Sequence, residues 1–448
     1  MTNKPTPNQT FTADFIAEGL DQTRGRFRTL HILGHAIKEE NAMKNVIVNG
    51  IILAEDGKKM AKSLKNYPDP QLLIEKRGGD SFRLHMLASP SVKAEPMRFN
   101  EKGTEQAFKD FTLPLQNVFN FFETYAKIDN WKSEGTEVYL MRHAEANKTG
   151  EKQNFNEPLN ENGKTSLEHQ VFIETVLRVN PDIIIDNEFT RVQETAQGAK
   201  KVMKEYANKE VEIISQTGDF TKIDNLQLYQ ELLQQYKGKR ILIVSNREKF
   251  ARLRSQLYST DFSEQYKEIK NLEVIELPTY QLKNDLDKRI LAELHSTLIK
   301  VDGYLQQYIL DEATKVAMDF IDKLTNRRLR RSRRRFRTNG MNEDKDAAYA
   351  TLYWVLKRYL QILAPFTPFI TEYLRLQLAN FTVSHTNSPK SSSIHLSFRP
   401  FAHTHYINQA LIDEIATLRK IIKLALFVRA KNKIAVKQPL QKLQVKID

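Results

Sequence analysis

Hydrophobic and polar positions follow different periods in different parts of the chain. Between about residues 135 and 282, short apolar runs alternate with stretches of helical period. The apolar runs cover residues 137–141, 183–185, 211–214, 241–244 and 272–277. The helical stretches cover residues 163–179, 191–207, 226–236 and 249–258. Strands that alternate with helices of about 10–15 residues predict a mainly parallel sheet flanked by helices.

The parts before and after this region are mainly helical in pattern. Apolar residues recur every three to four positions across residues 70–87, 105–125, 347–363 and 411–428, and at Leu291, Leu294, Leu298 and Val301. This spacing predicts helices that bury one face. One exception is the segment 45–53, where two apolar runs surround Asn49 and Gly50 and predict a β-hairpin.

The net charge and the cysteine content of the chain indicate which kind of partner it binds and in which cellular compartment it folds. The chain of 448 residues has 68 Lys and Arg against 55 Asp and Glu, a formal net charge of +13. This excess favours a polyanionic partner, and nucleic acid is the first candidate. The absence of cysteine excludes disulfides and thiolate zinc sites and is typical of a reducing cytosol. No apolar run approaches the ~20 residues that span a bilayer, and the first residues lack an apolar signal segment, so we expect a cytoplasmic protein without a membrane anchor.

The first part of the chain contains a short lysine motif, Lys59-Met60-Ala61-Lys62-Ser63. Its two lysines are three positions apart in a polar loop, so their ammonium groups can converge on a polyphosphate. Taken alone, the motif is more typical of a solvated turn. Its surroundings favour a functional interpretation, because FIAEGLDQTRGRF precedes it at residues 15–27 and LKNYPDP follows it.

Together these stretches resemble the isoleucyl branch of the class I aminoacyl-tRNA synthetases, whose KMSKS loop binds ATP. The resemblance covers nearly all of residues 10–131. It implies that Lys59 and Lys62 stabilise the phosphates of ATP, which such enzymes use with Mg²⁺, and that Lys62 is the more important of the two. Ala61 stands where the family usually has Ser, so one hydroxyl group is missing from the loop.

The same resemblance assigns a second set of residues to the aminoacyl-adenylate. It implies that Glu18, Asp21 and Gln22 contact this intermediate, since a carboxylate can pair with the α-ammonium group of the amino acid. The alternative is that the two acids are solvated or cap a helix. Arg26 stands where the family usually has Trp, which changes the packing expected around the adenylate.

The last part of the chain contains an arginine run. Eight arginines lie between Asn326 and Thr338. On a helix, four of them would form one stripe suited to phosphate oxygens: Arg327, Arg330, Arg331 and Arg334. A solvated face with so many like charges is unfavourable, so contact with RNA or packing against acids is favoured. This run and residues 348–372 resemble the helical anticodon-binding domain of the same family, which implies tRNA as a partner.

The middle part places Arg142 and His143 at the end of a predicted strand. With PLNENGKTSLEHQ at residues 158–170 and FTRVQETA at residues 189–196, it resembles the histidine phosphatases, which are phosphoglycerate-mutase-like. The resemblance implies that His143 is the nucleophile and that Arg142 and Arg191 neutralise the phosphoryl group. The family's second His is replaced by Asn246, which cannot be charged. We therefore expect phosphate binding with impaired or lost hydrolysis; the alternative is that these residues only maintain the fold.

The predicted fold is multidomain, α/β plus all-α. Residues 1–134 would form the end of a Rossmann-like class I synthetase catalytic domain with its KMSKS-type loop. Residues 135–282 would form an inserted α/β histidine-phosphatase-like domain, and residues 283–448 a helical-bundle anticodon-binding domain with a C-terminal extension. In the synthetase family the two flanking segments follow one another closely, so the middle domain is predicted to be inserted in a surface loop whose ends lie close together.

These resemblances support three hypotheses on function. The first is the C-terminal part of an isoleucine–tRNA ligase, which activates isoleucine with ATP and transfers it to tRNA. The sequence contains neither the family's HIGH motif in its usual place nor the editing domain, so we expect it to need a separately encoded N-terminal half or to be part of a longer enzyme. The second hypothesis is a non-catalytic, tRNA-binding pseudo-synthetase. The third is a histidine-type phosphatase with RNA-binding flanks. No metal site is expected in any of them.

Overall fold

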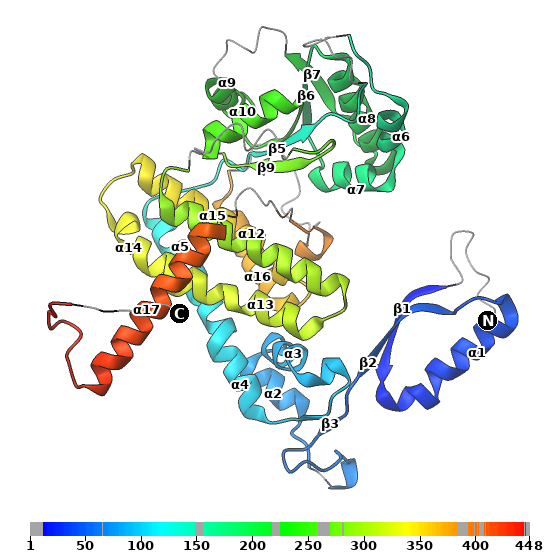
Figure 1. Ribbon diagram of the computed structural model, residues 1–448, viewed down its shortest axis with the longest axis vertical. Coiled ribbons are helices and arrows are strands. Elements are labelled where there is room, and N and C mark those ends of the chain that lie inside the picture. The colour runs from blue at the N-terminus through cyan, green and yellow to red at the C-terminus, as the bar shows by residue number, and fades with distance from the viewer. Residues whose placement is uncertain are drawn as a thin grey trace.

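The computed structural model describes residues 12–64, 66–147, 156–216, 225–258, 269–279, 282–383, 393–397, 399–400, 402, 407, 409–442 and 444. Figure 1 shows an α/β region at one end of the long axis, a helical body in the centre, and the N-terminal strands with their helix at the side. Within the described residues, no helix is long and apolar enough to cross a membrane. The architecture is thus mixed α/β with a separate helical region, as predicted.

The N-terminal region contains two parallel strands joined by a helix. β1 (Ala13–Gly19) is followed by the short helix η1 (Leu20–Arg24) and by α1 (Arg26–Lys38), and β2 (Met43–Asn49) pairs with β1 in register. The next strand, β3 (Ile52–Leu53), pairs in parallel with β4 (Met97–Arg98). The hairpin predicted over residues 45–53 is therefore wrong.

Gly50 has a steric role rather than a turn-forming one. Its amide donates to the carbonyl oxygen of Ser91 at 2.6 Å. A Cβ atom at this position would lie 1.9 Å from the carbonyl oxygen of Glu95. The Asn-Gly pair, which usually indicates a tight hairpin turn, here marks a close approach of two backbone segments.

Each of the next two predicted helices is interrupted. The first is divided into α2 (Pro70–Arg77) and α3 (Gly79–Leu87) by Gly78, whose φ of 81° lies outside the helical range. The second consists of α4 (Glu101–Ala107), a π-helical turn (Phe108–Thr112) and α5 (Leu113–Ile128). Pro114 explains this turn, because proline has no amide N–H for a regular helical hydrogen bond.

The C-terminal region is mainly helical, as predicted. Its helices are α12 (Asp285–Gln306), α13 (Leu310–Asp322), α14 (Arg330–Arg337), α15 (Glu343–Leu363), α16 (Pro368–Leu378) and α17 (Gln409–Lys431). A π-helical segment, Lys323–Leu329, joins α13 to α14. Large side chains that are fully buried fill the core between these helices, among them Phe320, Phe336, Tyr349 and Tyr359.

The segments before and after the middle region pack together as one body. Asp80 of α3 accepts hydrogen bonds from the amides of Phe369 at 3.3 Å and Ile370 at 2.6 Å, in the first turn of α16. Lys93 forms an ion pair of 2.8 Å with Asp311 of α13. One continuous hydrophobic core joins α5 to α13 and α15. The two flanks therefore share an interior, and the same core continues into the middle region through residues such as Leu140 and Phe250.

The middle region is a five-stranded sheet with helices on both faces. Its strands are β5 (Glu137–Arg142), β6 (Ile183–Asn187), β7 (Glu212–Gln216), β8 (Arg240–Ser245) and β9 (Val274–Leu277). They lie in the order β7-β6-β8-β5-β9, and β9 is antiparallel to β5 while the other pairs are parallel. The five predicted strands and the mainly parallel sheet are confirmed.

The helices of this region divide between the two faces of the sheet. α7 (Gln170–Val179) and α8 (Thr190–Ala207) pack on one face, and α9 (Asn225–Gln235) and α10 (Arg247–Tyr258) pack on the other. The helix predicted over residues 163–179 is two helices, with α6 (Glu161–Glu168) preceding α7. The break occurs at His169, whose backbone is extended and whose side chain caps α7.

Both ends of the middle region lie against the first turn of α15. On the entry side, the indole N–H of Trp131 donates to Asp346 at 2.7 Å. On the exit side, the Asn284 amide donates to Asp344 at 3.1 Å. Two chain ends held by the same helical turn must be close together, which is the geometry that allows a domain to be inserted without disturbing its host.

A buried polar network also joins the middle sheet to α15. Glu276 of β9 forms an ion pair with Arg358 and accepts a hydrogen bond from the Trp354 indole at 2.9 Å. Glu137 of β5 forms an ion pair with Lys357. Glu276 and Arg358 are both buried. The middle region is therefore fixed to the helical body by side chains and not only by its two connections.

Candidate functional sites

The end of β1 carries the residues proposed to contact the adenylate. Glu18 forms an ion pair with Arg26 at the start of α1. The Gln22 side-chain amide donates to Asp21 at 2.9 Å, and its carbonyl oxygen accepts from the Arg26 amide at 3.2 Å. The structure therefore brings Glu18, Asp21 and Gln22 together around the entry to α1. Arg26, which departs from the family pattern, is the partner of Glu18.

The lysine loop follows β3 and is anchored at two points. The Asn66 side chain accepts from the Ala61 amide at 3.0 Å and donates to the Lys59 carbonyl at 3.1 Å. Met60 packs against a small core that contains Leu73 and Phe99. Lys59 itself is exposed. These contacts hold the backbone of the loop and leave the Lys59 ammonium group at the surface, where it can meet an anionic ligand.

Lys62 begins the short helix η2 (Lys62–Leu64), and its side chain lies outside the described part of the structure. Glu18, Asp21 and Gln22 contact Arg26 and one another, whereas the loop contacts Asn66 and the core near Leu73. The two proposed parts of the adenylate site are thus held independently. Figure 1 shows the loop at the foot of the molecule, beyond β3, and α1 at its side.

The arginine run divides into structural and exposed residues. Arg328 and Arg335 are directed inward and both pair with the buried carboxylate of Asp287, at 2.5 and 2.8 Å. Arg335 also pairs with Asp344 at 2.8 Å. These two arginines therefore fix α14 against α12 and α15. The sequence predicted that either RNA or acidic residues would neutralise the run, and in this structure acids neutralise one part of it.

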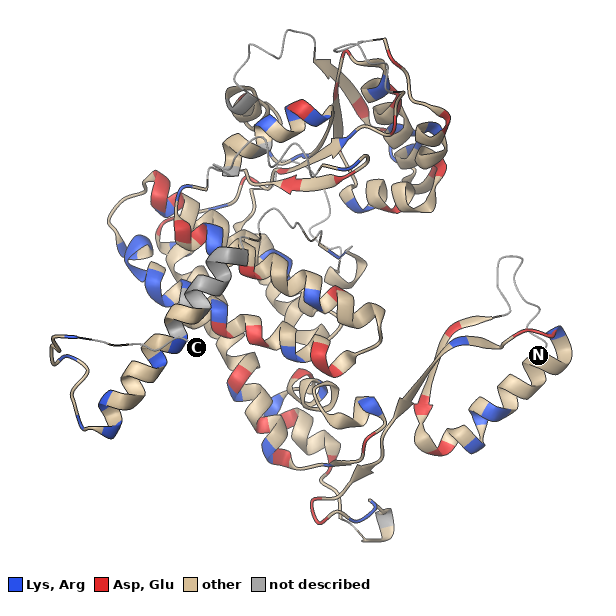
Figure 2. Ribbon diagram, viewed as in Figure 1, with Lys and Arg blue, Asp and Glu red and all other residues tan. Residues whose placement is uncertain are grey.

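The remaining part of the run faces outward. Arg330, Arg331 and Arg334 of the predicted stripe are exposed, as is Arg333, which the sequence analysis did not include. Figure 2 shows this concentration of basic residues on α14. Arg327 lies in the π-helical segment, and its side chain is outside the described part of the structure. We call Arg330, Arg331, Arg333 and Arg334 the α14 basic face.

The middle region places Arg142 and His143 where β5 ends. His143 is buried, and one of its ring nitrogens, Nδ1, lies 2.6 Å from the Ala144 carbonyl oxygen. The Arg142 guanidinium donates to the Ile269 carbonyl at 2.7 Å. Arg191, at the start of α8, lies 3.6 Å from the Glu157 carboxylate and 4.7 Å from the centre of the Phe189 ring.

Burial, together with the positive charges of Arg191, Arg142 and Arg247, lowers the pKa of His143 to about 4. The imidazole is therefore neutral near pH 7, which is the form that a nucleophile or a hydrogen-bond acceptor requires. Arg247, the residue after Asn246, is the member of this group that the sequence analysis missed. Its position directly after strand β8 was the signal that could have found it.

Asn246 has a structural role in place of the expected catalytic one. Its side-chain oxygen accepts a hydrogen bond from the Lys249 amide at 2.9 Å, in the first turn of α10. Asparagine is among the residues preferred for this capping position. The side chain that would have to supply a proton in a phosphatase is thus engaged with backbone, and it has no titratable group.

Across the described ranges, no group of three or more His, Asp and Glu side chains is placed to hold a metal ion.

Comparison with known families accounts for the two flanks. Residues 1–98 match the family described as tRNA synthetases class I (I, L, M and V). Residues 287–447 match the anticodon-binding domain of tRNA ligases. Both flanks are thus similar to parts of the class I tRNA synthetases. The middle sheet, from β5 to β9, lies between the two matched ranges.

Relatives among characterised proteins agree with this family. The chain is 30% identical over 435 residues to the isoleucine–tRNA ligase of Chlamydia trachomatis serovar L2, and 29% identical over 435 residues to that of Chlamydia muridarum. Both alignments cover 97% of this chain and 28% of the relative. The chain thus spans little more than a quarter of the length of these ligases.

Solved structures with partial similarity were also found. The LeuRS of Agrobacterium radiobacter K84, in a ternary complex with tRNA and LeuAMS, is 12% identical, with a TM-score of 0.39 over 88% of this chain and 29% of that one. The "putative phosphohistidine phosphatase SixA" from Agrobacterium tumefaciens is 18% identical, with a TM-score of 0.25 over 32% of this chain and 90% of that one.

Proposed function

We propose that this chain is the KMSKS-bearing part of an isoleucine–tRNA ligase, which joins isoleucine to ATP as an adenylate and transfers it to tRNA. The observation that carries this proposal is the shared interior of the two flanks, each of which matches a synthetase family. Because α3 caps α16 through Asp80, the lysine loop and the basic helices belong to one body. A pseudo-synthetase without a catalytic role would not need the loop in this arrangement.

The residues at the end of β1 and in the lysine loop have complementary roles in this proposal. The ammonium groups of Lys59 and Lys62 neutralise charge on the ATP phosphates as the isoleucine carboxylate attacks the α-phosphorus and pyrophosphate leaves. Glu18 pairs with the α-ammonium group of isoleucine. Arg26 now occupies this carboxylate, so it would have to share Glu18 with the substrate or move aside.

The surface of the N-terminal unit supports the need for a further protein segment. Parallel sheets are normally buried on both faces. In the described structure, however, the sheet of β1 and β2 has only two strands, and Phe15 and Val46 on them are exposed. Ile32, Leu33 and Ile37 of α1 are also exposed. We propose that this surface is covered by the HIGH-bearing part of the catalytic domain.

ATP–pyrophosphate exchange tests this proposal directly. The 448-residue chain alone should give no exchange, and adding a synthetase fragment with the HIGH motif should produce isoleucine-dependent exchange. Replacement of Lys62 by Ala should then lower the rate by about 100-fold or more, since one donor to a developing charge contributes on that order. Lys58→Ala is the matched control, because Lys58 is an exposed lysine of the same loop that pairs with Asp56.

ATP–pyrophosphate exchange at normal synthetase rates by the chain alone would contradict the proposal that a separate HIGH-bearing segment is required. Aminoacylation that stays absent with the added fragment, while tRNA still binds, would favour the pseudo-synthetase instead.

The α14 basic face provides the test of tRNA binding. Replacing Arg330, Arg331 and Arg334 with Gln should weaken binding of tRNA and reduce the slope of log K against log salt by about 2 to 3, because each lost phosphate contact removes roughly 0.7–0.9 from it. A matched control replaces Lys164, Lys201 and Lys204, three exposed lysines of the middle region, and removes the same charge. Equal weakening by both triple variants would show that only net charge matters.

A second candidate function concerns the middle region. We propose that it binds a phosphate group through Arg142, Arg191 and Arg247 around the neutral imidazole of His143, without transferring it. The support is the position of Arg142 and His143 at the end of β5, the effect of the three arginine charges on the His143 pKa, and the capping role of Asn246. The chain should show no hydrolysis of p-nitrophenyl phosphate; hydrolysis that is abolished by His143→Ala would establish a phosphatase instead.

A further inference from the structure

The lysine loop is part of a small sheet in which three backbone segments lie side by side. β3 pairs in parallel with β4, so that Leu53 lies beside Arg98. On its other side, Leu53 forms an antiparallel bridge with Lys59. Residues that lie opposite one another on neighbouring strands direct their side chains to the same face of a sheet. Lys59, Leu53 and Arg98 therefore form one row, with a cation on each side of a leucine.

This row lies on the outer face of the small sheet. The residues that alternate with it pack in the small core around Leu73: Ile52, Met60, Met97 and Phe99. Lys59 and Arg98 are exposed, and Leu53 is half-buried. Because side chains alternate between the two faces along a strand, the packing of the core face fixes the direction of the outer face. A strand that is far from the loop in sequence thus places an arginine beside the loop lysine.

The guanidinium group of Arg98 lies flat against the turn of the loop. A Cβ atom at Gly57 would lie 3.2 Å from each of the Cζ, Nε and Nη2 atoms of Arg98. Equal distances to three atoms of one planar group mean that its face, and not its edge, is directed to Gly57. The turn is closed by a hydrogen bond of 2.9 Å from the Gly57 amide to the Ala54 carbonyl. The N–H donors of a guanidinium lie in its plane, so this packing leaves them available to a ligand.

The two cations of the row are not neutralised by the protein. Among the residues that the structure describes, neither Lys59 nor Arg98 forms an ion pair or a side-chain hydrogen bond. Asp56, in the turn, is engaged by Lys58, whose amide donates to it at 3.0 Å and whose ammonium nitrogen lies 3.5 Å from it. Neighbouring strands are about 5 Å apart, so two long side chains in this row can reach one chain of phosphate groups between them.

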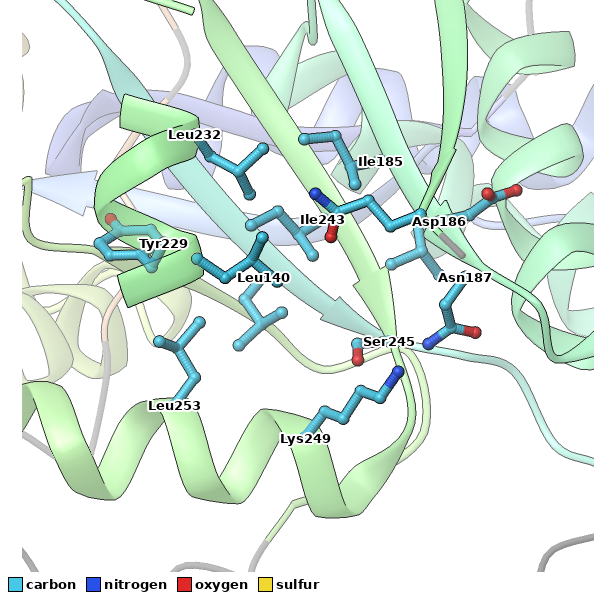
Figure 3. A pocket seen from close by; sticks show the side chains of 13 residues that line it. Leu140, Ile185, Asp186, Asn187, Tyr229, Leu232, Ile243, Ser245, Lys249 and Leu253 are labelled. Atoms are coloured by element: carbon cyan, nitrogen blue, oxygen red, sulfur yellow. The ribbon is translucent and has the colours of Figure 1, made fainter. Parts of the chain in front are cut away.

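The cations of the middle region lie in a different setting. Figure 3 shows a crevice beside α9 and α10, and its lining residues Leu140 and Leu232 are buried in the core. Lys249, which also lines this crevice, is itself partly buried. Lys59 and Arg98, in contrast, face solvent. The outer face of β3 and β4 is therefore the surface on which a free polyphosphate can meet two cations at once.

We propose that Arg98 is a further phosphate-binding residue, which together with Lys59 holds the phosphate chain of ATP on the outer face of β3 and β4. This inference rests on the proposed function and adds to it a residue that lies outside the lysine motif. The planar guanidinium can donate two parallel hydrogen bonds to the oxygens of one phosphate group, whereas the Lys59 ammonium group contributes a point charge.

Amide hydrogen exchange of residues 54–61, measured on the full chain at low ionic strength with increasing inorganic tripolyphosphate, tests this assignment. Tripolyphosphate should slow the exchange. Arg98→Gln should raise the concentration for half-maximal protection by about fivefold, the contribution of one exposed ionic contact. Arg98→Lys keeps the charge without the planar donors and should raise it by about twofold. Lys76→Gln is the matched control and should leave it unchanged, because Lys76 is an exposed cation of α2 that lies 3.9 Å from Glu101.

The combined ATP–pyrophosphate exchange assay gives a second measurement, in which Arg98→Gln should raise the KM for ATP by about fivefold and leave the KM for isoleucine unchanged. Equal half-maximal concentrations for Arg98→Gln and the unaltered chain would overturn the role of Arg98 and leave the proposed function intact. Faster exchange of the loop in Arg98→Gln without tripolyphosphate, together with an unaltered response to it, would make Arg98 only a support of the turn. No protection in the unaltered chain would overturn this inference together with the proposed role of the lysine loop. Protection without isoleucine-dependent activity in the combined assay would overturn the proposed function alone.

Discussion

The molecule contains two α/β units, one parallel and one mainly parallel, that differ in how completely their sheets are covered. In the N-terminal unit, Phe15 and Val46 are 54% and 50% exposed although they lie on paired strands. In the middle region, Ile184 and Leu242 are fully buried, and helices cover both faces of the sheet. Strands and helices thus form a sheet covered on both faces in the middle region, and a sheet that is only partly covered in the N-terminal unit.

Charged groups show the same contrast. Glu18 of the N-terminal unit pairs with Arg26 at the surface, where water screens both charges. Glu276 of the middle sheet pairs with Arg358 in the interior, where neither charge is well screened. The buried ion pair therefore contributes more to stability than the surface pair, and the surface carboxylate of Glu18 is the more accessible of the two. The incomplete unit is the one whose exposed apolar surface is available to a partner segment.

The largest expected effect comes from removing the buried carboxylate. Glu276→Gln should lower the free energy of unfolding by about 3–5 kcal/mol, because it leaves the Arg358 charge buried with a weaker partner. Glu18→Gln, the same change at the surface, should cost about 1 kcal/mol or less. Amide hydrogen exchange of β9 and α15 measures the first effect locally. Similar protection in both variants would contradict the contrast between the two regions.

A comparable contrast is expected for apolar side chains. Ile184→Ala in the middle sheet should cost about 3 kcal/mol, since it creates a cavity in a covered sheet. Val46→Ala in the N-terminal sheet should cost less than about 1 kcal/mol, because the side chain already contacts water. Urea denaturation of both variants, with amide hydrogen exchange measured at β6 and at β2, compares the two losses in the free energy of unfolding. A large loss at Val46 would mean that β2 is covered in solution.

The sequence predicted the middle sheet well because its strands are short apolar runs separated by helical stretches, and buried parallel strands require that pattern. It failed at residues 45–53, because Asn49-Gly50 has the composition of a hairpin turn and the reason for Gly50 is the nearby Glu95 carbonyl. A steric contact between segments that are far apart in sequence leaves no local signal.

The arginine run shows a similar limit at the candidate sites. Helical spacing placed Arg330, Arg331 and Arg334 on one exposed face, which the structure confirms. It could not separate them from Arg328 and Arg335, because both of these depend on Asp287, about 40 positions earlier. Arg247 was missed for the same reason, since its relation to His143 requires β5 and β8 to be neighbours.

The two regions should also differ in how pH acts on them. His143 is buried and its pKa is lowered to about 4, from about 6.5 in the unfolded chain. Protons therefore bind the unfolded state first as the pH falls, and stability should be lost between about pH 6.5 and pH 4, by up to about 3 kcal/mol. His295, with its pKa lowered by burial to about 3, acts in the same direction.

Replacement of His143 by Gln removes this contribution, and the loss of stability on going from pH 7 to pH 5 should become smaller. The unaltered chain provides the reference for this comparison. Chemical denaturation at several pH values measures both. An unchanged pH dependence in the His143 variant would show that this imidazole titrates normally.

The smallest effect on the free energy of unfolding is expected for a substitution on the exposed face of α1. The same substitution also tests whether this face binds the HIGH-bearing segment. Ile37 is 68% exposed, so Ile37→Ser should change the free energy of unfolding by less than about 0.5 kcal/mol. If the HIGH-bearing segment covers this face, the same change should lower exchange activity in the combined assay by about tenfold. Ile128→Ser is a closely matched control, because Ile128 is 67% exposed at the end of α5. An equal response of both variants would mean that the exposed apolar face of α1 is simply surface, and the incomplete sheet would then need another explanation.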